Sequence, residues 1–179
     1  MKTEKKTKKL VLSALFLALA YLLPYVTGQI REIGAMLCPM HLPILLCGFI
    51  CGPIYGLAVG FTAPLFRSLT LGMPKLFPSA VCMSFELMTY GALAGLFYRI
   101  LPRKRGFLYV SLILAMLAGR LVWGAASFAA YGVQGGRFTL TAFLAGAVTN
   151  AIPGIILQIL LIPPLVMILE RKSKENFTF

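Results

Sequence analysis

The sequence predicts an all-α integral membrane protein, a compact bundle of six transmembrane helices with both termini in the cytoplasm. Composition carries much of this prediction: of 179 residues, 59% are hydrophobic and 12% are charged, against roughly 45–50% and ~25% in soluble domains. At about 20 apolar residues per crossing, the length allows about six spans and no separate extramembrane domain. A soluble enzyme is therefore excluded, and the placement of the basic residues sets the orientation.

Apolar runs separated by Gly, Pro and charged residues place the spans in one membrane domain, residues 1–179. The first run contains Ala-Leu-Ala at 18–20, which imitates a signal-peptide cleavage site. It continues to a helix-ending Pro24, so a retained span is preferred over cleavage. The second and third spans are short and meet at Gly-Pro, 52–53, which predicts a tight hairpin. The six spans are expected near residues 9–25, 42–52, 54–71, 78–100, 107–131 and 140–168.

The net charge of +12 would indicate nucleic-acid binding in a soluble protein, because clustered Lys and Arg neutralise phosphates. Here the basic residues lie at the ends of apolar runs, so they report membrane topology and no nucleic-acid partner is expected. Twelve of the 17 fall in three stretches, residues 2–9, 99–105 and 171–174, which six spans place on one side of the lipid bilayer. The positive-inside rule makes that side cytoplasmic.

Groups for metal binding or acid–base catalysis are scarce. The four cysteines and the single histidine, His41, match no standard zinc spacing, and the chain contains no aspartate. The sequence also lacks a phosphate-binding loop, a nucleophile elbow and a His-Glu-x-x-His pair. We therefore predict no metal, no cofactor, no catalytic residue and no enzymatic activity. The cysteines are expected to be buried inert thiols, and His41 is expected at a membrane edge.

Polar residues inside the apolar runs are few: Glu86, Arg120 and Asn150 lie on three different spans, and Gln158 lies deeper in the last span. A charge inside hydrocarbon costs at least ~2.5–3.5 kcal/mol, so such residues are candidates for function by default. With a rise of about 1.5 Å per residue, the three lie about 12, 16 and 15 Å below the outer face. Their common depth predicts one shared site among the last three spans.

Helical spacing adds neighbours to this site. Trp123 and Ser127 follow Arg120 at three and seven positions, and Tyr90 follows Glu86 at four. We expect these side chains, with the third polar residue, to line a pocket that opens outward. The alternative is a structural ion pair between Glu86 and Arg120, with the aromatic side chains filling the bundle. The pocket is preferred because a buried ion pair rarely compensates its own desolvation.

Two polar, glycine-containing loops, 27–34 and 131–137, are expected on the outer side, either as a lid over the pocket or as ordinary solvated connections. Arg31, in the first loop, is counted with the ligand-binding residues. Arg67, at the outer end of the third span, is expected to extend toward lipid headgroups, with a role in the pocket as the alternative.

Small residues recur every fourth position, which predicts close helix contacts. Glycines follow this spacing over 48–60 and again over 91–95. Ala14 and Ala18 repeat it on the first span, where the alanine face could instead meet a partner subunit.

Nearly the whole chain matches one known pattern: a short basic N-terminus, Ser-Ala-Leu-Phe-Leu-Ala at 13–18, a loop before a Pro- and Gly-rich second span, and six spans in under 200 residues. In this it resembles the substrate-binding S components of energy-coupling factor (ECF) vitamin transporters. Residues 41–44 and 51–60, His-Leu-Pro-Ile and Cys-Gly-Pro-Ile-Tyr-Gly-Leu-Ala-Val-Gly, are similar to the branch that includes pantothenate- and pyridoxine-type S components.

The resemblance implies that Ala14 and Ala18 face a transmembrane coupling subunit. It also implies that substrate binds near the outer side among spans four to six, under the first loop. Two cytoplasmic ATPases would supply the energy, so that ATP is used by partner subunits and not by this chain. A multi-pass location in a bacterial plasma membrane follows from the same resemblance.

We therefore interpret the chain as the substrate-binding subunit of an ECF-type importer for a small water-soluble vitamin or related metabolite. Arg120 would hold a carboxylate, Glu86 and Asn150 would bind hydroxyl or amide groups, and Trp123 and Tyr90 would pack on the ligand. These groups favour a pantothenate-like anion, followed by a pyridoxine-like or purine-like ligand. The competing class is an integral-membrane enzyme or assembly factor with a structural Glu86–Arg120 pair.

Overall fold

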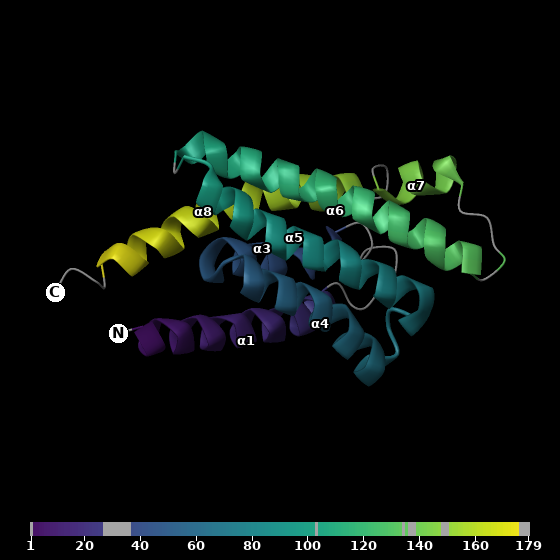
Figure 1. Ribbon diagram of the computed structural model, residues 1–179, viewed down its shortest axis with the longest axis horizontal. Helices are drawn as coiled ribbons and strands as arrows, with labels where there is room; N and C mark the ends of the chain where they lie inside the picture. The colour runs from purple at the N-terminus through teal and green to yellow at the C-terminus, as the bar shows by residue number, and fades with distance from the viewer. Residues whose placement is uncertain are drawn as a thin grey trace.

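The computed structural model describes residues 2–26, 37–102, 104–133, 135, 139–147 and 151–175. This described part of the chain is helical and contains no strand. Its elements are α1 (Lys2–Val26), α3 (His41–Cys51), α4 (Pro53–Leu71), an irregular turn η1 (Leu76–Ala80), α5 (Val81–Ile100), α6 (Arg105–Val133), α7 (Leu140–Ala147) and α8 (Ile152–Glu175) (Figure 1).

Five helices of the described part are long and apolar enough to cross a membrane: α1, α4, α5 with its leading turn, α6 and α8. The predicted all-helical membrane architecture is therefore confirmed. The second predicted span is α3, which has 11 residues and at 1.5 Å per residue covers only about 16 Å. The predicted span at 140–168 contains two helices, α7 and α8, and residues 148–150 between them lie outside the described part.

The helices run roughly along one axis, and the start of α1 and the end of α8 lie at the same end of it (Figure 1). The turn between α3 and α4 lies at this end too. Its Gly52 is next to the guanidinium of Arg99, in the last turn of α5, since a side chain at position 52 would overlap that group. Gly52 has a φ of 106°, which only glycine adopts readily, and this lets the chain reverse directly into α4. We call the end of the bundle that holds the start of α1, the α3–α4 turn, Arg99 and the end of α8 the basic end.

Helices α3, α4 and α5 pack backbone to backbone along a line of glycines. A methyl group on Gly48 or Gly56 would overlap the carbonyl of Gly91, and one on Gly60 would overlap the carbonyl of Leu87. Small residues allow such close approach because no side chain separates the helices. The predicted close contacts at these glycines are confirmed, and we call this contact the glycine seam.

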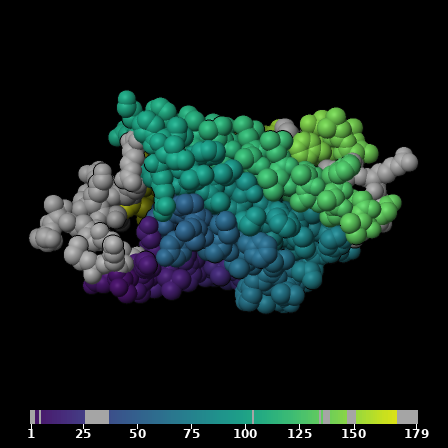
Figure 2. Space-filling model, viewed as in Figure 1, coloured from purple at the N-terminus to yellow at the C-terminus, as the bar shows by residue number. Residues whose placement is uncertain are grey.

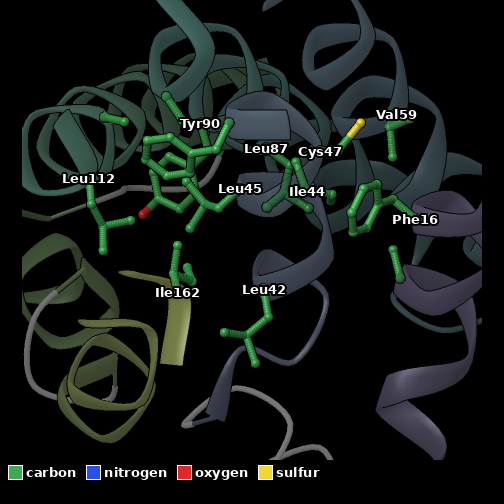
Figure 3. Packing of buried hydrophobic residues seen from close by; sticks show 14 of the residues in the cluster. Phe16, Leu42, Ile44, Leu45, Cys47, Val59, Leu87, Tyr90, Leu112 and Ile162 are labelled. Atoms are coloured by element: carbon green, nitrogen blue, oxygen red, sulfur yellow. The ribbon is translucent and has the colours of Figure 1, made fainter. Parts of the chain in front are cut away.

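Helix α3 is surrounded by α1, α4, α5 and α8, and nine of its 11 residues are buried. Its apolar side chains Ile44 and Leu45 meet Leu87 and Leu112 in the hydrophobic core, which Phe16 and Ile162 extend toward α1 and α8 (Figure 3). The four cysteines are buried and free of disulfides, as expected for thiols that act as small apolar side chains.

The expectation that Arg67 extends to lipid headgroups is wrong. This side chain is 4% exposed, and its Nη1 donates a hydrogen bond to the carbonyl oxygen of Tyr21 at 2.7 Å. Its guanidinium also lies over the ring of Tyr25, 5.3 Å from the centroid. The hydrogen bond and the ring contact together hold α4 against the last two turns of α1.

Candidate functional site

A cluster of polar side chains lies buried between α3, α5 and α6. Its centre is Glu86 of α5, which is 2% exposed. The Glu86 Oε1 lies 2.8 Å from Arg120 Nη1 on α6 and 3.5 Å from His41 Nε2 at the start of α3. With Tyr90 and Cys38, these residues form what we call the polar cluster.

The helical spacing of α5 aligns Tyr90 with Glu86, one turn apart on the same buried face. The Tyr90 ring meets the His41 ring edge-on, with centroids 5.3 Å apart. Gly119 of α6 provides the space, because a side chain there would overlap the Tyr90 ring. The glycine before Arg120 thus lets α6 approach α5 closely enough for the ion pair to form.

Cys38 joins the cluster from the turn that precedes α3. Its φ of 48° lies in the left-handed region, which is uncommon for residues other than glycine. The carbonyl oxygen of Cys38 accepts a hydrogen bond from the backbone N–H of His41 at 3.0 Å. Its thiol accepts one from Arg120 Nη2 at 3.7 Å. Strained residues of this kind concentrate at functional sites.

The polar cluster is incompletely satisfied. Neither ring nitrogen of His41 has a hydrogen-bond partner within the described part of the chain, and the same holds for Arg120 Nε. Glu86 Oε1 takes part in the ion pair but has no hydrogen bond of good geometry there. Each buried polar group without a partner costs about 1–3 kcal/mol. Arg120 is the more exposed member of its ion pair, at 14%, and Glu86 the less exposed, at 2%.

The structure thus brings together Glu86, Tyr90 and Arg120 from the predicted site, and it gives Trp123 and Ser127 other contacts. Trp123 stacks on Phe143 of α7, with centroids 6.2 Å apart. Ser127 is buried and in hydrogen-bonding contact with the Cys82 thiol. The remaining two predicted site residues, Arg31 and Asn150, lie outside the described residues.

An open groove of about 420 Å³ runs between α6 and α7. It is lined by Leu121, Gly124, Ala125, Phe128, Thr139, Leu140 and Phe143. Its lining is largely apolar and includes no member of the polar cluster, so this groove is not an entrance to Glu86.

His41 and Cys38 are site residues that sequence reasoning missed. His41 was expected at a membrane edge because it starts an apolar run. Helix α3 is only about 16 Å long, roughly half of a ~30 Å hydrocarbon layer, and its last residue adjoins the basic end. Its first residue, His41, therefore lies near the middle of the bundle. The shortness of the apolar run at 42–52 was the signal available in the sequence.

Ala14 and Ala18 lie on the exposed side of α1, whereas Ser13, Phe16 and Ala20 are buried against the bundle. Helix α1 lies at the lower left of the molecule in the view of Figure 2, coloured purple. The described part of the chain therefore leaves the alanine pair uncovered.

A bundle of apolar helices around a buried charged cluster defines a multi-pass membrane protein, and charges in such places mark pathways for substrates or ions. The chain belongs to the family described as ECF transporter, substrate-specific component, whose model matches residues 8–166. It is therefore a substrate-specific transporter subunit, a class that transports rather than catalyses. No curated protein and no solved structure matches the chain.

Proposed function

We propose that the chain captures a small water-soluble vitamin at the polar cluster, from the side of the membrane opposite the basic end. A transmembrane coupling subunit and two cytoplasmic ATPases would complete the importer, with Ala14 and Ala18 facing the coupling subunit. The basic end would then be cytoplasmic, as the positive-inside rule requires, in the plasma membrane of a bacterium.

The observation that carries this proposal is the set of buried, unpartnered polar atoms on His41 and Arg120. A polar cluster retained only for stability would satisfy its own hydrogen bonds, because unsatisfied buried groups destabilise the fold. A ligand with both donors and acceptors would complete these bonds. His41 of α3 and Arg120 of α6 both contact Glu86, so a ligand bound to both would also connect these helices.

A pantothenate-like anion is the preferred ligand, because a carboxylate can accept from Arg120 Nε while hydroxyl and amide groups meet Glu86 and His41. A pyridoxine-like ligand is the second candidate, with its ring against Tyr90 and its hydroxyl groups on Glu86. A purine-like ligand would use the same ring contact.

The proposal is tested by thermal unfolding of the detergent-purified protein with pantothenate, pyridoxine, other water-soluble vitamins and nucleobases. A ligand at 100 times its Kd stabilises the folded state by about 2.7 kcal/mol. We expect a shift with one compound or a small chemically related group. A folded preparation that no compound stabilises would contradict vitamin capture at this site.

The competing role is a structural ion pair in a membrane enzyme or assembly factor, which the 2.8 Å contact between Glu86 and Arg120 favours. Glu86→Gln separates the two roles. Breaking the buried pair lowers thermal stability in either role, but only a binding subunit also loses a ligand-induced thermal shift, because a purely structural pair has no ligand to lose. Thr62→Ala is a matched control, because this exposed hydroxyl bonds only to carbonyls of its own helix, Ala58 and Val59, among the described contacts.

A further inference from the structure

The charges of the polar cluster balance without a ligand. Arg120 is paired with Glu86 at 2.8 Å, so its positive charge is already compensated. An anionic ligand that binds Arg120 would leave two carboxylates sharing one guanidinium in a buried site. Uncompensated charge is costly there, so an anionic ligand needs a second cation beside Glu86.

His41 is placed to become that cation. It is 3% exposed, its Nε2 lies 3.5 Å from Glu86 Oε1, and neither ring nitrogen has a hydrogen-bond partner in the described part of the chain. A neutral imidazole can donate one hydrogen bond but compensates no charge. An imidazolium would donate to Glu86 and take over part of the role of Arg120, which would free the guanidinium for the ligand.

The titratable groups that face His41 can be named from each helix packed on α3. Helix α5 contributes Glu86 and Tyr90, and Cys38 precedes α3 itself. Arg120 of α6 acts through Glu86. Arg67 of α4 contacts Tyr21 and Tyr25 of α1 rather than His41. The buried polar residue described on α8 is Gln158, which carries no charge.

We propose that His41 supplies the counter-charge for a carboxylate ligand, so that binding of the anion is coupled to the uptake of one proton by the His41 imidazole. The proton comes from solvent, and the ligand carboxylate remains ionised on Arg120. A neutral ligand of the same shape binds without the proton. This inference rests on the proposed function and specifies which residue of the same site selects for ligand charge.

The chain allows a direct test because His41 is its single histidine. Protein labelled with ¹⁵N-histidine gives one imidazole, whose ring-nitrogen signals distinguish the neutral from the protonated form. The probes are pantothenate and pantothenol, in which a primary alcohol replaces the carboxylate. Near pH 8, where an ordinary imidazole is neutral, we expect pantothenate to convert the His41 signals to the protonated form and pantothenol to leave them neutral.

Calorimetry provides the second readout. In buffers of different ionisation enthalpy, pantothenate binding should take up about one proton, and its Kd should rise about tenfold per pH unit above the range in which an ordinary imidazole titrates. The Kd of pantothenol should stay constant. In His41→Gln, the proton uptake and the pH dependence of pantothenate binding should both disappear, with folding checked by thermal unfolding.

The remaining outcomes overturn the inference in distinct ways. Proton uptake with a neutral His41 signal would place the proton on Glu86. Pantothenate binding without proton uptake would show that Arg120 alone compensates the charge of the ligand carboxylate. Binding of pyridoxine or pantothenol but of no carboxylate would reject the counter-charge while leaving vitamin capture intact. If no vitamin binds the folded protein, the proposed function fails together with the inference.

Discussion

The two sides of this bundle are joined in opposite ways. Helices α4 and α5 meet through the glycine seam, where backbones touch and no side chain lies between them. Helix α6 meets α7 through aromatic side chains, with Phe143 stacked on Trp123 beside an open groove. A backbone contact has one geometry, whereas stacked rings beside a groove can shift. The polar cluster lies between the two sides, with Glu86 on the seam helix α5 and Arg120 on α6.

The largest effect is expected where the two sides meet, in Arg120→Met. This change leaves the buried Glu86 carboxylate without its guanidinium, and breaking a buried ion pair in this way costs about 3–5 kcal/mol of unfolding free energy. Chemical or thermal unfolding in detergent measures the loss. The double variant Arg120→Met/Glu86→Gln removes both charges and should recover most of it. Equal stability of the single and double variants would show that Glu86 does not depend on Arg120.

The next effect is expected in the glycine seam. The methyl group of Gly91→Ala would overlap backbone atoms of Gly56, and backbone cannot move aside as a side chain can. We expect a loss of about 1–3 kcal/mol in unfolding free energy. Gly106→Ala is the matched control, because no atom lies within 4 Å of the added methyl group at this helical glycine. Similar stabilities for both variants would contradict the close contact between α4 and α5.

How much of the structure could be predicted from the sequence also differs between the two sides of the bundle. The spacing of the glycines and the depth of Glu86 and Arg120 depend only on helical geometry, so the seam and the shared level of these two residues were predictable from the sequence, whereas their direct ion pair was the less favoured interpretation. His41 was not, because its depth depends on where α3 begins relative to its neighbours. Trp123 was not either, because its spacing from Arg120 does not reveal whether it faces α5 or α7.

The smallest effect is expected on the aromatic side. Phe143→Ala removes the ring stacked on Trp123, and such a pair contributes about 0.5–1.5 kcal/mol beyond the area that it buries. The midpoint temperature of thermal unfolding should therefore fall by less than in Gly91→Ala. Leu144→Ala is a suitable comparison, because the neighbouring Leu144 is 48% exposed and should change stability little. A Phe143→Ala loss as large as that of Gly91→Ala would remove the contrast between the two sides.

The stacking of Trp123 on Phe143 also gives the protein an optical reporter. Trp123 is the only tryptophan in the chain, so all indole fluorescence comes from one ring. That ring lies one helical turn beyond Arg120 and against α7, where Gly146 adjoins its edge. Its emission wavelength and quenching therefore follow the joint between α6 and α7 in the unlabelled protein. A displacement of α6 during substrate capture would be visible as a spectral change, in a membrane as well as in detergent.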